Sequence, residues 1–343
     1  MARTAIVVFN LGGPDGPDAV RPFLFNLFSD PLIIRAPGPL RWALAQFISR
    51  RRAPVARAIY AEMGGASPIL QRTRAQAEAL QAEIGEVETR VFVAMRYWHP
   101  FAAECAAEVK AFAPDRVVLL PLYPQFSTST TASFARVWTG AARDAGLAAD
   151  TRIVCCYPAE PGFVAATAAL IRESLARIEG DRTPRLLFSA HGLPENFIAA
   201  GDPYCSHVGM TVAAVVQALD GAKFEPSISY QSRVGSLEWV KPYTDDEIRR
   251  AGAEGVPLVI VPIAFVSEHS ETLVELDIEY GRLARESGVP QYERVPAVGT
   301  HPDFIGGLAR LAKEALSEDV PVMPDGGARL CGTSFGACPC RAD

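Results

Sequence analysis

The sequence predicts an α/β protein of two similar Rossmann-like domains, each a parallel sheet flanked by helices, with a cleft between the domains. Strand-like runs alternate with amphipathic, alanine-rich helical stretches such as Thr73–Ile84 and Phe163–Ile178, an alternation typical of parallel sheets. At 343 residues, the chain is also long for a single hydrophobic core. The predicted strands are Ala5–Leu11, Val91–Trp98, Arg116–Leu122, Thr151–Tyr157, Arg185–Ala190, Ser227–Gln231, Pro257–Phe265 and Tyr292–Val298.

Short motifs recur in the same order in the two halves of the chain. Leu119–Ser127 aligns with Ile260–Glu268, and Met95-Arg96 aligns with Ser232-Arg233 at nearly the same offset. Such a repeat favours two similar domains, with a ligand between them where strand ends from both halves converge. The predicted organisation is a first domain at 1–160 with a lip at 31–53, a second domain at 161–300, a helix at 301–318 that returns to the first domain, and a cysteine-rich tail at 319–343.

Composition and charge limit the classes of function. Apolar residues make up 49% and charged residues 21%, as in an ordinary globular protein, and a net charge of −6 argues against nucleic acid as a partner. No apolar run approaches the roughly 20 residues that cross a bilayer. The N-terminus leads into a strand-like run instead of a signal peptide. With seven cysteines, these features favour a cytoplasmic protein whose cysteines are thiols or metal ligands.

An acidic segment follows the predicted strand Pro257–Phe265. A helix would align its glutamates in one row, which repels itself unless a cation or a proton occupies it. The alternative is a solvated acidic face at a helix start. The nearby His269 and the position beyond a strand end favour a binding site, because ligands bind there in open α/β sheets. We also expect this segment to depart from a regular α-helix, since single π-turns concentrate at functional sites. The row consists of Glu268, Glu271, Glu275 and Glu279.

A second histidine follows another predicted strand of the same half. His191 comes directly after Arg185–Ala190, and Gly192 indicates a turn there. A lone histidine after a strand is more often structural, but we expect His191 to face the same cleft as His269 and Glu271. A neutral imidazole accepts a proton near pH 7 or binds iron or zinc. Histidine and carboxylates together therefore suit removing a proton from a nitrogen acid and guiding a divalent cation.

The first half offers basic and aromatic residues instead. Arg96 and Tyr97 end its second predicted strand. Guanidinium groups pair with carboxylates, and aromatic faces suit a flat apolar ring. The segment Pro39–Arg52, within the lip, is apolar and ends in three arginines. Two interpretations stay open for it: a helix packed over the cleft, or a surface that admits an apolar, anionic ligand and touches a membrane.

These motifs resemble those of the ferrochelatases, which insert ferrous iron into a porphyrin. The resemblance covers about residues 5–315, with the motifs in the same order, and it implies the chelatase-like fold of two Rossmann-like domains around a cleft. The motifs that carry it are Phe9–Pro14, Gly64–Pro68, Met95–Pro100, Leu122–Gln125, Ser189–Pro194, Gly201–Tyr204, Tyr230–Gly235 and Pro262–Tyr280.

The resemblance also implies roles for single residues. His191 would accept pyrrole protons or bind the metal, and Glu271 would be its partner at the metal site, so both are candidate Fe²⁺ ligands. Glu275 and Glu279 would continue an acidic path. The resemblance does not decide which residue removes the pyrrole proton and which delivers iron. The candidate catalytic residues are His191, Glu271 and Glu275, and the candidate porphyrin-binding residues are Arg52, Tyr60, Ser67, Arg96, Tyr97 and Trp239.

A cluster of cysteines lies beyond the last predicted helix, Pro302–Leu316. Cys331, Cys338 and Cys340 can reach one centre, and a tetrahedral zinc or an iron–sulfur site needs a fourth ligand. The tail resembles the ending of those ferrochelatases that carry a [2Fe–2S] cluster, although its spacing differs from the better-known form. Candidates for the fourth ligand are Cys105, Cys155, Cys156 and Cys205. We favour Cys156 slightly over Cys155, because adjacent residues of a strand face opposite sides and only one of the two should bind.

Taken with the resemblance, the sequence predicts a lyase that inserts Fe²⁺ into protoporphyrin IX to give protohaem, the last step of haem biosynthesis, without a nucleotide. Alternatives are a chelatase for coproporphyrin or another tetrapyrrole, and a haem- or iron-binding redox sensor. A dinucleotide oxidoreductase is disfavoured, because no G-x-G-x-x-G motif follows a predicted strand. We expect a cytoplasmic protein associated peripherally with the inner membrane. Its oligomeric state is left open, with a homodimer as one candidate.

Overall fold

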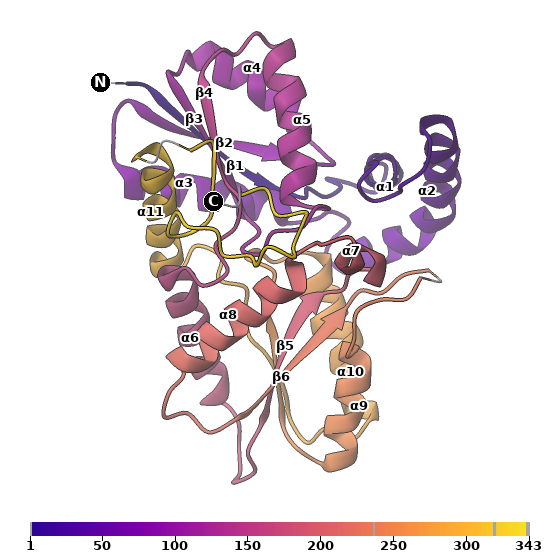
Figure 1. The fold of residues 1–343 in the computed structure, drawn as a ribbon. Helices are drawn as coiled ribbons and strands as arrows, with labels where there is room; N and C mark the ends of the chain where they lie inside the picture. The colour runs from indigo at the N-terminus through magenta and orange to yellow at the C-terminus, as the bar shows by residue number, and fades with distance from the viewer. Residues whose placement is uncertain (1, 236, 318–319, 341–343) are drawn as a thin grey trace. The chain divides into compact units, whose positions relative to one another are not determined.

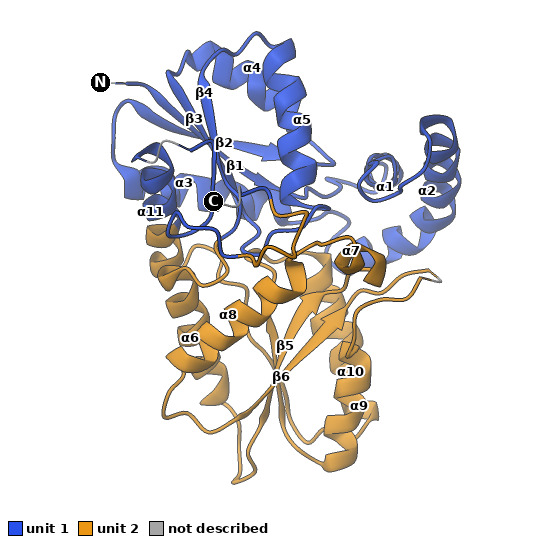
Figure 2. Ribbon diagram, in the orientation of Figure 1, with its two compact units in different colours: residues 1–156, 308–330, 339–343 blue, residues 157–307, 331–338 orange. Residues whose placement is uncertain are grey.

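The computed structural model describes residues 2–235, 237–317 and 320–340. Residues 318–319 and 341–343, which belong to the predicted returning helix and tail, lie outside the described residues. The chain forms two compact units (Figure 2). The first comprises residues 1–156, 308–330 and 339–343, and the second comprises residues 157–307 and 331–338. Each unit is an α/β structure with its own parallel sheet.

The sheet of the first unit has five strands in the order β2-β1-β3-β4-β9. Its interior strand β1 is buried along its whole length, as expected of a continuous apolar run. Helices α4 and α5 pack on one face of the sheet. Helices α1 and α2 pack against each other beside it (Figure 1). The strands are β1 Thr4–Asn10, β2 Thr89–Met95, β3 Arg116–Pro121, β4 Asp150–Val154 and β9 Val322–Met323. The helices are α1 Val20–Phe28, α2 Gly38–Ala61, α3 Ile69–Ile84, α4 Ala102–Phe112, α5 Thr131–Asp144 and α11 Pro302–Ser317, of which residues 308–317 belong to this unit.

The sheet of the second unit has four parallel strands in the order β6-β5-β7-β8. Helices α6 and α8 cover one face, and α9 and α10 cover the other (Figure 1). The strands are β5 Arg185–His191, β6 Glu225–Gln231, β7 Leu258–Pro262 and β8 Tyr292–Arg294. The helices are α6 Pro161–Leu175, α7 Glu195–Ala199, α8 Tyr204–Ala218, α9 Thr244–Glu254, the π-helix η1 Glu271–Tyr280 and α10 Gly281–Glu286.

The two sheets repeat one strand order. In each sheet the first strand of the unit pairs with the second on one side and with the third on the other, and the fourth follows the third. The predicted fold class, an α/β protein with two similar parallel sheets flanked by helices, is therefore confirmed. In sheets of this order, ligands bind beyond the carboxyl ends of the strands where the order reverses, here beside β1 and β5.

The structure differs from the predicted strands at their ends and in one addition. All eight predicted strands are present, but β7 and β8 are shorter than the apolar runs that predicted them. The short strand β9, which was not predicted, extends the first sheet by pairing with β4. It holds two residues between Pro321 and Pro324, too few for a period-two pattern to appear.

Candidate active site

Three neighbouring strands of the second unit bring polar side chains to one edge of its sheet. His191 is the last residue of β5, Gln231 ends the adjacent β6, and His269 and Glu271 follow the other neighbour, β7. Because carboxyl ends of parallel strands meet at one edge, side chains distant in sequence converge here. The predicted convergence of His191, His269 and Glu271 is confirmed.

The backbone fixes which nitrogen of His191 carries hydrogen. Its Nδ1 lies 2.6 Å from the carbonyl oxygen of Gly192, and a carbonyl only accepts. The Nδ1 atom therefore donates, and Nε2 of the neutral ring keeps its lone pair. That Nε2 lies 3.6 Å from Oε1 of Glu271. Gly192 leaves no room for a side chain, since a Cβ there would lie 2.9 Å from the carbonyl oxygen of Gln231 and 3.1 Å from the Trp239 ring.

His269 approaches Glu271 from the other side in a similar way. Its Nδ1 lies 3.0 Å from the carbonyl oxygen of Ser267, and its Nε2 lies 3.5 Å from Oε2 of Glu271. Burial opposes protonation of His269, but its contact with Glu271 and that carboxylate's charge outweigh burial and raise the pKa of His269 above its ordinary value. The raised pKa of His269 therefore reflects its pairing with the Glu271 carboxylate.

Glu271 is the carboxylate on which both histidines converge. Burial works to raise its pKa, but the electrostatic interaction with His191 and the contact with His269 lower that pKa to about 2. Glu271 is thus ionised at neutral pH. Two ring nitrogens and two carboxylate oxygens face one another at this point, and without positive charge their lone pairs repel. The arrangement therefore favours a proton or a metal cation among these atoms.

Glu275, one turn further along η1, is held by hydrogen bonds instead. Its Oε1 accepts from the Ser232 backbone N–H at 2.9 Å and from the Tyr280 hydroxyl at 3.1 Å. Its Oε2 accepts from the Ser232 hydroxyl at 2.5 Å and from the Gln231 amide at 3.0 Å. Burial and the charge of Glu271 raise the pKa of Glu275, while the bonds from Ser232 and Gln231 oppose that rise.

The segment Glu271–Tyr280 is a π-helix, so the predicted departure from a regular α-helix is confirmed. The Gln231 amide donates to the Glu271 carbonyl at 3.1 Å, and the Tyr292 hydroxyl donates to the Leu276 carbonyl at 2.6 Å. These two side chains donate hydrogen bonds to backbone carbonyl groups of a helix whose turns are wider than those of an α-helix. The row ends at Glu279, which is exposed to solvent.

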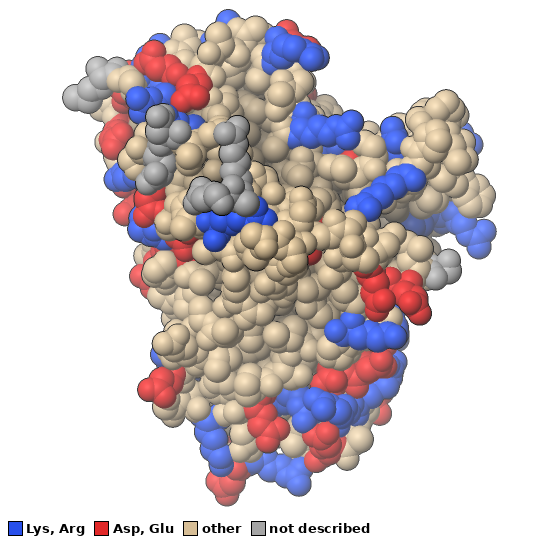
Figure 3. Space-filling view, viewed as in Figure 1, with Lys and Arg blue, Asp and Glu red and all other residues tan. Residues whose placement is uncertain are grey.

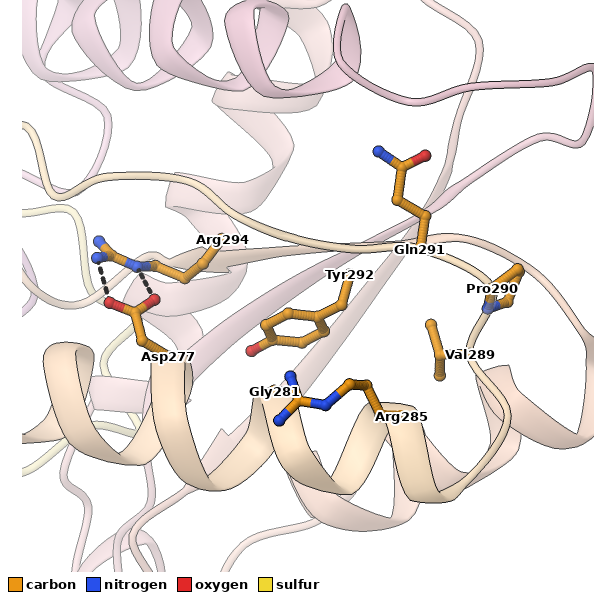
Figure 4. A pocket seen from close by; sticks show the side chains of 8 residues that line it. All are labelled: Asp277, Gly281, Arg285, Val289, Pro290, Gln291, Tyr292 and Arg294. Atoms are coloured by element: carbon orange, nitrogen blue, oxygen red, sulfur yellow. Dashed lines mark hydrogen bonds and ion pairs between the residues drawn. The ribbon is translucent and has the colours of Figure 1, made fainter.

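Glu268 does not belong to this row, contrary to the expectation from its spacing. It precedes the helix, which begins at Glu271, and it pairs with Arg294 at 2.5 Å. Asp277 pairs with the same guanidinium group at 2.6 Å and 2.7 Å (Figure 4). Asp277 and Arg294 line a pocket of about 460 Å³, together with Tyr292 and Arg285. None of the candidate catalytic residues lines that pocket.

In the first unit, Arg96 and Tyr97 bind a buried aspartate that the sequence analysis missed. Asp30 accepts from the Arg96 guanidinium at 2.6 Å and from the Tyr97 hydroxyl at 2.8 Å, and it also binds the Ser133 hydroxyl. The Tyr97 side chain is fully buried, and only 15% of the Arg96 side chain is exposed. The Arg96 charge is thus neutralised within the unit.

The other predicted porphyrin-binding residues are dispersed within their units. Arg52 is exposed on α2, and Tyr60 is buried near the end of that helix. Ser67 precedes α3, and its backbone N–H donates to the Pro14 carbonyl at 2.8 Å. Trp239 lies in the second unit, with its ring centroid 6.4 Å from that of His191. Trp239 therefore lies close to the candidate catalytic histidine within the second unit.

Four of the cysteines make contacts with other sulfur or nitrogen atoms. In the first unit, Sγ of Cys155 lies 3.3 Å from Sγ of Cys156 and 3.4 Å from Sγ of Cys340. In the second unit, Sγ of Cys331 lies 3.1 Å from Nε2 of His207. All seven cysteines lie within the described residues, and no disulfide joins them. The Cys155 thiol is therefore in contact with two other thiols, with no disulfide between them.

One premise about Cys155 and Cys156 is wrong. They were expected on a strand with side chains on opposite sides, but β4 ends at Val154 and the two sulfur atoms are in contact. Once the chain leaves the strand, the alternation of side chains no longer applies. Sequence reasoning also missed His207, because a histidine inside an apolar helix gives no signal of the cysteine that it contacts.

Comparison with known proteins identifies relatives across the chain. A ferrochelatase family model matches residues 3–316. The ferrochelatase of Caulobacter vibrioides strain NA1000 is 52% identical over 343 residues, covering 99% of this chain and 98% of the relative. That of Phenylobacterium zucineum is 54% identical over 345 residues, with coverages of 99% and 98%. A Wolbachia ferrochelatase is 49% identical over 314 residues, covering 90% of this chain and 98% of the relative.

Solved structures of other chelatases share the fold. SirB from Bacillus subtilis with Fe³⁺ superposes with a TM-score of 0.57 at 11% identity, covering 92% of this chain and 96% of SirB. CbiX, described as the terminal enzyme of sirohaem biosynthesis in denitrifying bacteria, gives a TM-score of 0.50 at 16% identity, covering 92% of this chain and 100% of CbiX. The predicted chelatase-like fold is therefore confirmed.

The matches to relatives extend over nearly the whole chain, well beyond the local motifs that carried the resemblance. They confirm the predicted family and enzyme class. The chain belongs to the ferrochelatase family, lyases that insert iron into protoporphyrin in haem biosynthesis.

Proposed function

We propose that this chain inserts Fe²⁺ into protoporphyrin IX with His191 and Glu271 at the point of insertion. The observation that supports these roles is the convergence of the His191 and His269 rings on Glu271 at the ends of β5 and β7. The reaction releases two protons, because a neutral porphyrin gives up both pyrrole hydrogens when a dication enters. The site must therefore accept protons and attract a cation.

The chemistry of the two residues divides naturally between these tasks. The His191 Nε2 lone pair accepts a pyrrole proton, and the Nδ1 hydrogen bond to Gly192 holds the ring in the required tautomer. Glu271, ionised at neutral pH, attracts the ferrous ion. His269 holds the carboxylate from the other side. As the ion arrives, its charge lowers the proton affinity of the facing rings, which favours passing the protons to solvent.

Glu275 and Glu279 extend the site outward along η1. Glu279 is exposed and Glu271 is partly enclosed, so the row leads from solvent to the histidines. Ferrous iron accepts oxygen and nitrogen ligands, and a row of carboxylates offers it successive positions of similar energy. We therefore assign Glu275 a role in delivering iron, with Glu279 as the outer end of the path.

The porphyrin would be held by Arg52, Tyr60, Ser67, Tyr97 and Trp239, with Arg96 supporting the wall that binds it. Arg52 has an exposed guanidinium group that suits a propionate. Arg96 is engaged by Asp30, so we assign it a role in fixing the end of β2 rather than in a direct ion pair. Insertion needs a bent macrocycle, because a planar porphyrin keeps its nitrogen lone pairs in the ring plane. Binding to a rigid wall supplies that strain.

We further propose that the tail cysteines hold a [2Fe–2S] cluster with Cys331, Cys338, Cys340 and one of Cys155 or Cys156 as ligands. The donor chemistry fits, since thiolates are the usual ligands of such clusters and these sulfur atoms are not joined by disulfides. Among the described residues, no three ligand side chains already form a metal-binding geometry, so the proposal depends on thiol chemistry and on the contacts of Cys155. A bound cluster would stabilise the folded tail.

Contact with a membrane surface is proposed for α2. Leu40, Trp42 and Phe47 are between 54% and 63% exposed, an unusual amount for large apolar side chains on one helix. The helix carries five arginines and no acidic residue, and the charged side chains over it are mainly basic (Figure 3). Among the described residues, no helix is long and apolar enough to span a bilayer. We therefore propose a cytoplasmic protein that binds anionic membranes peripherally.

The test of the proposed function compares the wild-type protein with His191→Ala under anaerobic conditions. Haem formation from Fe²⁺ is measured with protoporphyrin IX and with coproporphyrin III, and porphyrin binding is followed separately by fluorescence quenching. We expect protoporphyrin turnover in the wild type and binding without turnover in the variant. If the wild type prefers coproporphyrin III, that porphyrin replaces protoporphyrin IX as the proposed substrate. If the variant turns over near the wild-type rate, His191 has no role in insertion. Binding without turnover by the wild type would favour a sensor.

A further inference from the structure

The turn after β6 contains a residue in a conformation that side chains normally avoid. Ser232 has a φ of 65°, in the left-handed region that glycine favours. Among the described non-glycine residues, only Ala113, at the end of α4, also has a positive φ. A helix end commonly adopts this conformation. Ser232 follows a strand at the candidate site, where strained backbone is typically held by its surroundings for a functional reason.

The left-handed backbone directs two donors of Ser232 at one carboxylate. Its N–H donates to Oε1 of Glu275 at 2.9 Å, and its hydroxyl donates to Oε2 at 2.5 Å. The Gln231 amide adds a second donor to Oε2, and the Tyr280 hydroxyl adds a second donor to Oε1. The carboxylate is therefore held by four donors, two on each oxygen, and its position and orientation are fixed.

Gln231 connects this carboxylate to the rest of the site. Its side-chain amide donates both to Glu275 and to the carbonyl of Glu271, and its side-chain oxygen accepts from the Ser189 hydroxyl at 2.7 Å. Ser189 lies on β5, two residues before His191. The turn at the end of β6 therefore links the strand that carries the histidine to the π-helix that carries the glutamates.

We propose that Ser232 is a positioning residue for iron insertion, which fixes Glu275 behind Glu271 and thereby sets the affinity of the acidic row for ferrous iron. This inference rests on the proposed function, because it assumes that the row receives the ion. A carboxylate with a free rotamer would adopt many positions, only some of which could share a cation with Glu271. Ser232 confines Glu275 to one of them at the expense of an unfavourable φ.

Two substitutions separate this role from a structural one. Ser232→Gly and Ser232→Ala both remove the hydroxyl, but glycine adopts a φ of 65° without strain, whereas alanine retains the strain. We expect the KM for Fe²⁺ to rise about tenfold in both variants, the scale set by one hydrogen bond to a charged group. The KM for porphyrin should stay unchanged. The melting temperature should be higher for the glycine variant than for the alanine variant.

If Ser232 had only a structural role, the KM for Fe²⁺ would change with the stability of the protein. The more stable glycine variant would then have a KM near that of the wild type. Ser227→Ala is the matched control, because this serine lies on β6, the strand that precedes Ser232, and donates to Glu247 at 3.3 Å, away from the site. Its KM for Fe²⁺ should match that of the wild type. An unchanged KM for Fe²⁺ in both Ser232 variants would overturn the inference alone. A wild-type protein without turnover would overturn the proposed function and this inference with it.

Discussion

Replacing Glu271 with glutamine isolates the charge that the candidate site contributes to iron insertion. The substitution keeps the size of the side chain and removes its negative charge. Glu271 is ionised at neutral pH, because its pKa falls from an ordinary 4.5 to about 2. At about 1.36 kcal/mol per pKa unit, the surroundings favour the carboxylate by roughly 3 kcal/mol. Because 26% of the side chain is exposed, solvent screening brings this value nearer to about 2 kcal/mol.

A dication at the same place should interact with the carboxylate at least as strongly as the histidines do. Loss of 2 to 3 kcal/mol corresponds to a fall in kcat/KM for Fe²⁺ of about 30-fold to 150-fold. The assay is the initial rate of haem formation under anaerobic conditions at saturating porphyrin. An unchanged rate between pH 6 and 8 would show the acidic row to be a solvated face, and the electrostatic reasoning would be wrong.

The same variant makes a second, independent measurement available. The pKa of His269 is raised because its contact with Glu271 and that residue's charge outweigh burial, so glutamine should lower it towards the range that burial favours. NMR titration of the ring nitrogens in labelled protein measures this change. A His269 that titrates identically in the wild type and the variant would contradict the assigned pairing, even if turnover fell.

Three further changes test the remaining proposals. Cys338→Ser should bleach the visible absorption of the purified protein and lower its stability, because the cluster would lose a ligand. Trp42→Ser combined with Phe47→Ser should weaken binding to anionic liposomes in a sedimentation assay, because two large exposed apolar side chains of α2 are removed. Asp30→Asn should lower the free energy of unfolding in urea by about 3 to 5 kcal/mol, because it leaves the Arg96 charge without its buried partner.

Each of these changes has a matched control. The Cys205→Ser protein should keep its visible absorption. If the Cys338→Ser protein also keeps it, the proposed set of cluster ligands is wrong. Val87→Ser removes an apolar side chain that is 96% exposed outside α2, and equal liposome binding by all variants would argue against the membrane surface. Asp144→Asn breaks an exposed ion pair and should change stability by about 0.5 kcal/mol or less. A similarly small effect at Asp30 would contradict its assigned role.

The stability contribution of Asp30 should also depend on pH. Burial works to raise its pKa, but the hydrogen bond from Ser133 and the charge of Arg96 outweigh burial and lower the pKa below its ordinary 3.8. A lowered folded-state pKa stabilises the protein above the unfolded-state value, and that stability is lost as the pH falls through the folded-state pKa. The difference in stability between the wild type and Asp30→Asn should therefore shrink as the pH drops below 4, as urea titrations at several pH values would measure.

Local patterns in the sequence predicted the parts of the fold that repeat. The apolar run at Thr4–Asn10 is a strand buried along its whole length, and its boundaries were predicted to within one residue. The convergence of His191 and Glu271 was predictable for a similar reason, since the carboxyl ends of adjacent parallel strands lie together whatever the loops between them do. The signal in both cases lies within one short segment and in the order of the strands.

What escaped prediction depends on contacts between distant segments or on backbone angles. Asp30 pairs with Arg96, 66 residues away, and nothing around Asp30 indicates that partner. Ser232 adopts a conformation that its residue type does not favour, so the motif containing it gave no reason to expect it. Glu268 was placed in the acidic row because spacing alone does not reveal that the helix begins three residues later. Such features are decided by packing and not by local propensity.

The most direct test of the site is the absorption spectrum of the purified protein under anaerobic conditions, before and after protoporphyrin IX and Fe²⁺ are added. We expect the porphyrin bands to convert to those of haem only in the presence of enzyme, and the conversion to be lost in His191→Ala. A porphyrin spectrum that persists with the wild-type protein, or one that converts equally well with the variant, would contradict insertion of iron at His191 and Glu271.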